Sequence, residues 1–486
     1  MAGETQTNSY SSMLRGSAML GGVQVLQMLV NLVKGKFVAM ILGPEGMGIT
    51  SLFNSASATI TQVASLGLNM SFVKEVAATK EDPGKYAAVR ALARKLAVLT
   101  SLLGAAMCVF LSPWLSRLTF GGSGYEWQFC LLGAAVFLTV WGNARLAVLQ
   151  GLHEVRRISK ASVVGALTGL CVGVPLYWLF GTKGIVPAMV LMALAVFIFY
   201  SLNLRKADPA PAVKVDWRSH MPLARKLLAN GMVLAVSGIV SSLVLYAVGV
   251  FIRATGSTSE VGLYQAANNI LLQYSSLVTS AMAVDYFPRL AATKSRPAEF
   301  NSIVARELDL LLLFVTPIAL LVILFAPVVV NLILTAEFAP IVPLVRLMAL
   351  GFVLKMFLFP LGYIAFAQDN RRVFFLLECV FGQGVSLAAY LLCFHWFGLI
   401  GIGYALAAIY IVANPVYAAV NHRLYGTRLP APVVWRLAAS LIVTGGAVWL
   451  TFISGNVAAY SALSVVTAVV CVWNLAILKR KLKKEK

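Results

Sequence analysis

The stretch NLVKGKFVAMILGPEGMG, residues 31–48, places Lys34 and Lys36 inside a long apolar run that reaches a Gly-Pro pair at Gly43 and Pro44. An apolar helix of this length crosses a lipid bilayer. A charged side chain is costly there and is expected to face protein or a water-filled cavity. The stretch therefore predicts a membrane-spanning helix with a polar interior face.

The composition of the whole chain also indicates that it lies in a lipid bilayer. Of the 486 residues, 60% are hydrophobic and 12% are charged, and the mean hydropathy is +0.84. A water-soluble domain of this composition would expose large apolar patches. We therefore predict an all-α integral membrane protein with about fourteen transmembrane helices, because each crossing needs roughly 20 apolar residues.

The basic residues determine the predicted orientation. The formal net charge is +21, from 39 Lys and Arg against 18 Asp and Glu. With the N-terminus in the cytoplasm, most cations fall in loops on that side, whereas only Arg117, Lys183 and Arg253 fall in opposite loops. This bias predicts that both termini are cytoplasmic and explains the charge without a nucleic-acid partner. The C-terminal LKRKLKKEK is expected to lie against anionic membrane lipid.

Several classes of function have no signature in the chain. It contains no G-x-x-x-x-G-K-[ST] phosphate loop, no G-x-S-x-G elbow and no H-E-x-x-H helix. The six cysteines show no C-x-x-C spacing, and the four histidines are scattered. We therefore expect no enzyme activity, catalytic residue, metal, cofactor or disulfide. Because no basic residue precedes Arg15, the first apolar segment is expected to remain in the mature protein.

Two short motifs recur at nearly the same displacement. The tetrapeptide AATK occurs at 77–80 and 291–294, and the pattern FGxxGI occurs at 180–185 and 397–402. They predict two six-helix lobes related as parallel repeats, with substrate bound between them near the membrane midplane. The predicted parts are an N-terminal lobe (1–206), a cytoplasmic linker (207–222), a C-terminal lobe (223–424), and helices 13 and 14 with a basic tail (425–486).

Polar residues on the first helix form one stripe. Gln24, Gln27, Asn31 and Lys34 follow one another at spacings that keep them on one helical face, which we expect to point away from lipid. Lys36 lies about 200° around the helix from Lys34. The two lysines cannot both line one surface of an undistorted helix, and the sequence leaves open which of them faces the cavity.

Other candidates lie in later helices. Lys355 falls near the centre of its apolar run, while Arg346 and Arg253 lie near helix ends, where they could instead reach the interface. The carboxylates Glu378 and Asp285 are candidates for a coupling ion, with pairing to nearby arginines as the structural alternative. The predicted substrate-binding residues are Lys34, Lys36, Lys355, Arg253, Arg346, Asn31, Gln27, Asn54, Asn69 and Asn268. Because cations exceed acids within these helices, we expect an anionic substrate.

Three segments carry a resemblance to a known family. GKFVAMILGPEGMG, GFVLKMFLFPLGYIAFAQDNRRVFFLLECV and FGLIGIGYALAAIYIVANPVY resemble flippases of lipid-linked oligosaccharides of the O-antigen translocase (Wzx) kind. The resemblance extends over most of the chain in length, spacing and helix count. The glycine before Lys36, Lys36 itself, Lys355, Arg253 and Glu378 match the family pattern, whereas Lys34 is not part of it.

This resemblance implies the fold of the multidrug/oligosaccharidyl-lipid/polysaccharide (MOP) exporters, with a central cavity and alternating access. It also implies a substrate: an undecaprenyl-diphosphate-linked oligosaccharide, from O-antigen, capsule or a related glycan, moved from the cytoplasmic to the periplasmic leaflet of the bacterial inner membrane. Energy would come from an ion gradient or from the substrate gradient. A polymerase and a chain-length regulator of glycan assembly are the expected protein partners.

Two other functions stay open at this point. A cation-coupled multidrug exporter of the same superfamily would rely on carboxylates within the membrane. A membrane scaffold of envelope glycan assembly would use the polar stripes only to pack helices together. The lysine-rich interior favours the flippase over both.

Overall fold

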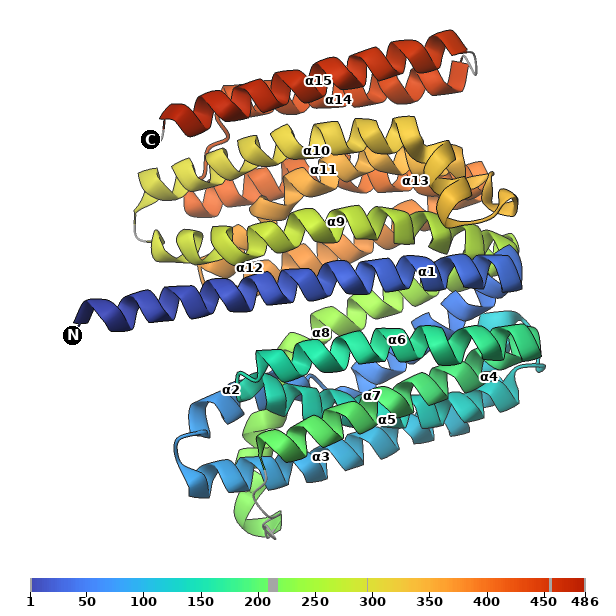
Figure 1. Ribbon diagram of the computed structural model, residues 1–486, viewed down its shortest axis with the longest axis vertical. Helices are drawn as coiled ribbons and strands as arrows, with labels where there is room; N and C mark the ends of the chain where they lie inside the picture. The colour runs from blue at the N-terminus through green and yellow to red at the C-terminus, as the bar shows by residue number, and fades with distance from the viewer. Residues whose placement is uncertain (1, 209–216, 295, 454–456, 485–486) are drawn as a thin grey trace. The chain divides into compact units, whose positions relative to one another are not determined.

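The computed structural model describes residues 2–208, 217–294, 296–453 and 457–484, and for some of these, including 2–21 and 281–285, the backbone only. Two compact units divide the chain at Val261 and Gly262. The first contains α1 (Ala2–Ser65), α2 (Leu68–Thr79), α3 (Pro83–Phe110), α4 (Ser112–Phe120), α5 (Glu126–Gly151), α6 (Val155–Phe180), η1 (Gly181–Gly184), α7 (Ile185–Ala207) and α8 (Trp217–Thr255) (Figure 1).

The second unit begins within α9 (Thr258–Ala292) and ends with the C-terminal helices. Its other elements are α10 (Pro297–Ile333), η2 (Ala336–Phe338), α11 (Ile341–Ala367), α12 (Arg371–Phe375), the π-helical η3 (Leu376–Gly382), α13 (Gln383–Tyr425), α14 (Ala431–Ile453) and α15 (Val457–Lys484). Of the predicted linker 207–222, residues 209–216 lie outside the described residues, and the rest includes the start of α8. The predicted lobe boundaries stay a prediction.

The predicted all-α membrane fold is confirmed. Within the described ranges, ten helical segments are long and apolar enough to cross a bilayer. Three of them, Leu26–Ser65, Val155–Ala207 and Arg371–Tyr425, have 40, 53 and 55 residues. At about 1.5 Å per residue each is long enough for two crossings of a roughly 30 Å core. Counting these three twice and adding the 35-residue α9 gives the number of crossings that the apolar runs predict.

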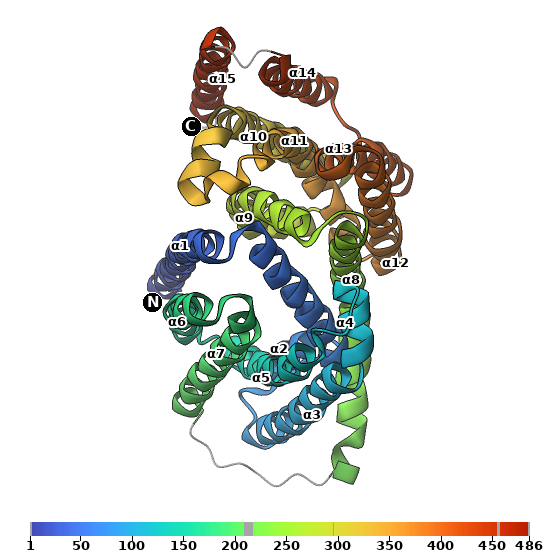
Figure 2. The ribbon, with the colours of Figure 1, turned by 90° about the vertical axis from the view of Figure 1, so that its right-hand side faces the viewer.

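Each long segment is interrupted at a glycine. In α1 the backbone leaves helical geometry at Gly43, with φ 63° and ψ −169°, directly before Pro44. The missing side chain of glycine permits a positive φ, and proline cannot continue the hydrogen-bond ladder of the preceding turn. Figure 2 shows the two halves of α1 running in different directions. The Gly-Pro pair in the opening stretch therefore ends one crossing and begins the next.

The FGxxGI repeat forms the same turn twice. Gly181 and Gly398 have φ of 56° and 58°. A Cβ on Gly184 would lie 2.3 Å from the Leu176 carbonyl oxygen, and one on Gly401 would lie 2.0 Å from the corresponding oxygen of Cys393. Both carbonyls belong to the residue eight positions before the glycine. The sequence repeat thus encodes a repeated backbone geometry in which two of its positions require glycine.

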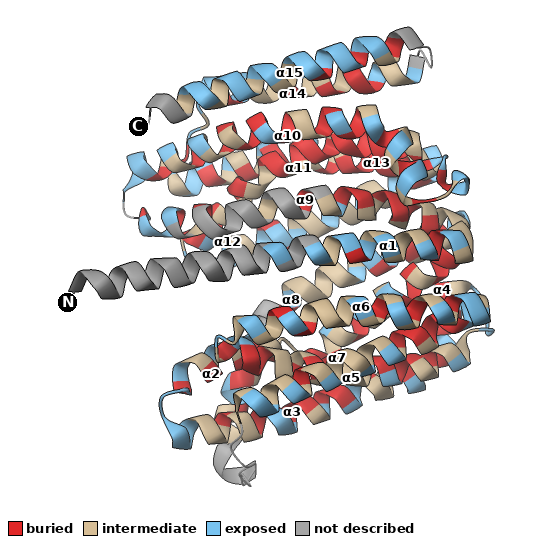
Figure 3. Cartoon of the chain, viewed as in Figure 1, coloured by how far each residue is buried: buried red, intermediate tan, exposed pale blue. Residues whose placement is uncertain are grey.

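Burial is greatest in the second unit along α11. In its most apolar window 72% of the residues are buried, against 11% for the last span, Ala459–Lys481 (Figure 3). Asn414 and Asn421 of α13 donate from Nδ2 to the carbonyls of Leu354 and Leu361 of α11, at 3.0 and 2.9 Å. The two donors are seven residues apart, and so are the two acceptors. The two hydrogen bonds therefore join α13 to α11 at points about two helical turns apart. Sequence reasoning missed this pairing, although the seven-residue spacing of the asparagines was a usable signal.

Candidate functional site

The first half of α1 separates an exposed apolar face from a polar one. The exposed apolar side chains recur every three or four residues, at Leu26, Leu29, Val33, Phe37 and Met40. On an ideal helix Lys34 lies about 100° from the centre of this face, and Lys36 lies about 60° from it. Lys34 is therefore turned further toward the neighbouring helices than Lys36.

Lys34 occupies a small niche against α6 and α7. Its Nζ lies 3.4 Å from the Sδ of Met192 on α7. It also lies 3.7 Å from the point where a Cβ on Gly169 of α6 would sit. The close packing of α1 against α6 allows this approach because Gly169 has no side chain (Figure 1). We call Lys34, Gly169 and Met192 the Lys34 niche.

The Lys34 niche contains a charge without an acidic partner. None of the ion pairs found in the described part of the chain involves Lys34. A thioether is a weak acceptor and carries no charge, so Met192 does not neutralise the ammonium group. Lys36 is also half-buried, and it has an interaction partner. The niche can therefore accept an anionic group that supplies the missing counter-charge.

The remaining polar candidates of the stripes differ in exposure. Gln27 is half-buried and Asn31 is exposed on the first half of α1, while the side chain of Gln24 lies outside the described residues. On the second half of α1, Asn54 is exposed. Asn69 of α2 and Asn268 of α9 are half-buried. Next to Asn268, the Nε2 of Gln265 donates to the Oδ1 of Asn269 at 2.9 Å.

In the second unit, Lys355 lies in the most buried helix. Its side chain is half-buried, between the buried Leu354 and Met356. No ion pair of Lys355 occurs among the residues that the structure describes. Lys355 is therefore a second ammonium group within a span that lacks an acidic partner in the described residues.

The two candidate arginines are held by hydrogen bonds to protein. Arg346 is only 6% exposed, so it does not reach the interface as its position near a helix end had suggested. It donates to the carbonyl of Ile323 and to the hydroxyl of Tyr460, at 3.2 and 2.8 Å, and so joins α11 to α10 and α15. Arg253 of α8 donates to the carbonyls of Leu118 and Thr119, both at 2.9 Å. These carbonyls end α4, so Arg253 caps that helix.

The candidate carboxylate Glu378 lies in the π-helical stretch η3. Its Oε2 accepts a hydrogen bond from the Tyr417 hydroxyl at 3.1 Å, and the residue is otherwise exposed. Pairing with Arg371 or Arg372, the structural alternative for this carboxylate, is not among the ion pairs of the described residues. Short π-helical stretches are frequent at functional sites. The other candidate, Asp285, lies outside the residues whose side chains are described.

Asp309 of α10 behaves differently from Glu378. It forms ion pairs with Arg436 of α14 and with Lys481 of α15. We call Asp309, Arg436 and Lys481 the Asp309 triad. It joins the last two helices to α10, and each oxygen of the carboxylate contacts a cation of the protein.

Three comparisons place the chain among known proteins. The family described as polysaccharide biosynthesis protein matches residues 37–343. A lipid III flippase of Escherichia coli (strain K12) is 24% identical over 412 residues, which are 82% of this chain and 96% of that protein. A lipid III flippase of Shigella flexneri matches with the same identity and coverage.

Solved structures share the fold. An inward-facing multidrug resistance MATE family transporter of the MOP superfamily has a TM-score of 0.71 and 17% identity, covering 84% of this chain and 98% of that one. The lipid II flippase MurJ in an inward closed conformation also has a TM-score of 0.71, with 14% identity, and covers 96% of this chain and 99% of its own. The chain therefore shares the fold of these transporters.

Proposed function

The chain belongs to the polysaccharide biosynthesis protein family, and on this premise we propose that it is a flippase for a polyprenyl-diphosphate-linked oligosaccharide. The substrate is an undecaprenyl-diphosphate-linked repeat unit of O-antigen, capsule or a related glycan. It moves from the cytoplasmic to the periplasmic leaflet of the inner membrane by alternating access. The two bacterial relatives are lipid III flippases, and this supports a lipid-linked substrate.

The observation that carries this proposal is the Lys34 niche. An ammonium group within a span is costly unless something compensates its charge. Here its side-chain contact among the described residues is a neutral thioether at 3.4 Å. A diphosphate is anionic and offers several acceptor oxygens, so its arrival would replace a weak contact with charge-assisted hydrogen bonds. Lys34 is thus the proposed diphosphate contact of the first unit, and Lys355 is the separate candidate in the second.

Glu378 is the proposed coupling residue. Its carboxylate accepts from Tyr417, and no cation neutralises it among the described residues. A proton or a cation from the gradient would supply that charge. Loading of Glu378 and its release would then accompany the change between inward-open and outward-open states.

The multidrug-exporter alternative receives less support from the side chains. Asp309 is paired with Arg436 and Lys481, and Glu378 is available to one cation. The ammonium groups of Lys34 and Lys355 have no acidic partner among the described residues, and this favours an anionic substrate over a cationic drug. The likeness to MATE transporters concerns the fold, which both functions share.

Native mass spectrometry of the full chain with an undecaprenyl-diphosphate oligosaccharide tests the proposal. Lys34→Met removes the charge and keeps the length of the side chain, and we expect about tenfold weaker retention, because a hydrogen bond to a charged group contributes roughly 1.5–3 kcal/mol. Lys36→Met, two residues away, tests the alternative lysine: a loss of retention there and not in Lys34→Met would assign the contact to Lys36. The retention measured for Lys355→Met tests the candidate lysine of the second unit separately. Retention that is equal in the wild type and in both the Lys34→Met and Lys355→Met variants would overturn the proposal.

A further inference from the structure

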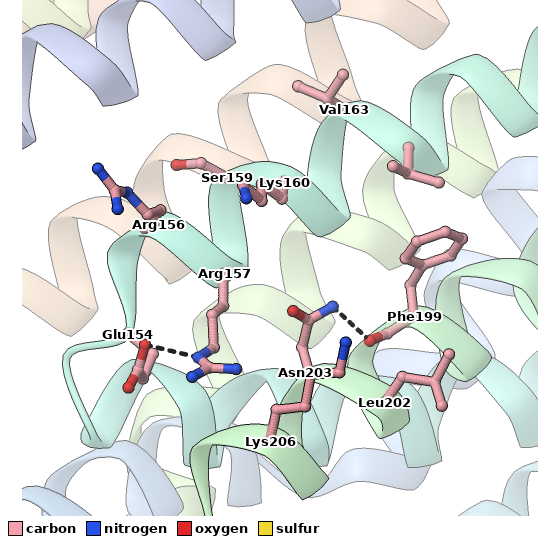
Figure 4. Close-up of a pocket in the computed structure, with 11 residues that line it drawn as sticks. Glu154, Arg156, Arg157, Ser159, Lys160, Val163, Phe199, Leu202, Asn203 and Lys206 are labelled. Atoms are coloured by element: carbon pink, nitrogen blue, oxygen red, sulfur yellow. Dashed lines mark hydrogen bonds and ion pairs between the residues drawn. The ribbon is translucent and has the colours of Figure 1, made fainter.

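A pocket of about 750 Å³ lies between the first turns of α6 and the last turns of α7, about one to two turns along the same helices from Gly169 and Met192 of the Lys34 niche (Figure 4). One side of it is basic and the other is apolar. Its lining residues are Glu154, Arg156, Arg157, Ser159, Lys160, Val163, Val164, Phe199, Leu202, Asn203 and Lys206. All of them belong to the first unit, at the end of the helices where the basic loops gather.

The basic side carries an excess of positive charge. Arg157 is neutralised by Glu154, with its Nε 3.0 Å from Oε2 (Figure 4). Arg156, Lys160 and Lys206 form none of the ion pairs found in the described part of the chain. Three cations around one concave surface make a favourable place for an anionic group.

A buried hydroxyl at the pocket wall also lacks a partner. Ser159 is 2% exposed, and its Oγ has no hydrogen-bond partner among the described residues. Buried polar groups are almost always satisfied, so an orphan hydroxyl at a pocket wall indicates a ligand atom or water that completes it. Ser159 and the exposed Lys160 both line the pocket, on the first turns of α6.

The apolar side continues onto an exposed face of α7. Phe199 and Leu202 lie across the pocket from Arg156 and Ser159 (Figure 4). Leu202 is 47% exposed, and it extends a row of exposed side chains formed by Leu191, Leu194 and Ile198. The spacings of three and four residues put these side chains on one face of the helix. In a membrane protein such a face contacts lipid chains.

From this arrangement we infer that the α6–α7 pocket binds an anionic glycerophospholipid of the cytoplasmic leaflet. Its phosphate contacts Arg156, Lys160, Lys206 and the Ser159 hydroxyl, and its acyl chains follow the apolar face of α7. The basic end and the apolar face fit the two parts of one amphiphile, whereas a free anion would use only the first. This inference does not depend on the identity of the transported substrate.

The test is native mass spectrometry of the full chain with phosphatidylglycerol, and with phosphatidylcholine as the zwitterionic comparison. In the wild type we expect preferential retention of phosphatidylglycerol. A triple variant, Arg156→Gln, Lys160→Gln and Lys206→Gln, should lose about fivefold in retention for each charge removed. The matched control is Lys74→Gln, Lys80→Gln and Arg225→Gln, which removes three exposed cations on the same membrane side that do not line the pocket. It should retain the lipid as the wild type does.

Ser159→Ala gives a second reading that separates binding from folding. If the hydroxyl serves the lipid, the variant should bind phosphatidylglycerol severalfold more weakly and unfold without lipid at the same temperature as the wild type, or higher. Lower thermal stability with unchanged lipid retention would assign the hydroxyl to folding and count against the proposal.

Three results would overturn the inference. The first is equal retention of phosphatidylglycerol by the wild type and the pocket triple variant. The second is an equal loss in the pocket variant and in the matched control, since that is a general effect of charge. The third is binding of inorganic phosphate or undecaprenyl phosphate that depends on these residues while phosphatidylglycerol binding does not.

Discussion

The Lys34 niche and the Asp309 triad both place charged side chains within membrane helices, but they differ in whether the protein supplies the opposite charge. Asp309 has two cationic partners, contributed by α14 and α15. Lys34 has a thioether and the space left by a glycine. In the triad every charged group has an opposite charge within the protein. In the niche the opposite charge has to come from outside.

The difference shows why the presence of a charge in a span does not by itself identify a functional residue. Both groups would be costly if isolated. What distinguishes them is whether the protein supplies the partner, because a satisfied charge holds helices together while an unsatisfied one can bind a ligand. Three substitutions test this contrast, at a buried pair, at the niche and at an exposed pair.

The largest effect on stability is expected at the triad. Asp309→Asn removes the carboxylate and leaves Arg436 and Lys481 as like charges. Breaking a buried ion pair costs about 3–5 kcal/mol, and because these cations are partly exposed we expect roughly 2 kcal/mol. Thermal unfolding of the purified protein in detergent measures the change. Glu299→Gln, which breaks the exposed pair with Arg296, is the control and should have little effect. An Asp309→Asn protein as stable as the wild type would contradict the structural role of the triad.

A smaller effect, on substrate retention, is expected when a methyl group at Gly169 narrows the Lys34 niche. Gly169→Ala would place a methyl group 3.1 Å from the Met192 Sδ and 3.7 Å from the Lys34 Nζ. The flexible methionine can move, so the fold should tolerate the change, but the room for a ligand beside Lys34 shrinks. We expect about threefold weaker retention of the lipid-linked oligosaccharide, or about 0.7 kcal/mol.

Gly384→Ala is the matched control for this narrowing. Gly384 lies in α13, and nothing lies within 4 Å of the position of the added methyl group. Its retention of substrate should equal that of the wild type. If Gly169→Ala also binds like the wild type, the niche is not where the substrate's anionic group binds.

Much of the fold could be predicted because a bilayer imposes simple requirements on a sequence. Apolar runs gave the crossings, and the Gly-Pro pair at residues 43 and 44 marked the end of the first one. The FGxxGI motif could be recognised in the sequence as a repeat, but the sequence did not show why glycine is required at its positions. Only the backbone shows that Gly184 and Gly401 each face a carbonyl oxygen too close for a side chain.

The candidate site could be predicted on one helix and not between helices. The spacing of Gln27, Asn31 and Lys34 indicated a face turned away from lipid. It could not show that Met192, 158 residues later, contacts Lys34. The family pattern includes Lys36 and not Lys34, whereas the structure turns Lys34 further toward its neighbours. Likewise, the sequence could not show that two partners of Asp309 come from α14 and α15.

The smallest effect is expected at an exposed pair outside the spans. Lys294 donates from Nζ to Oδ2 of Asp369 at 2.7 Å, and this hydrogen bond lowers the pKa of the Asp369 carboxyl below its usual value. A depressed carboxyl pKa stabilises the fold above the unfolded-state pKa, near 4, and that contribution disappears as the pH falls through the lower folded-state pKa.

The substitution Asp369→Asn removes the charge of this carboxyl group. Its backbone has φ 56°, a conformation that asparagine tolerates as well as aspartate does. We expect a slight loss of thermal stability at pH 7, because solvent screens a pair this exposed, and we expect it to vanish as the pH falls through the lowered folded-state pKa. A loss of stability at pH 7 as large as that of Asp309→Asn would show that the contribution of an ion pair does not depend on its exposure. The contrast between buried and exposed pairs would then be wrong.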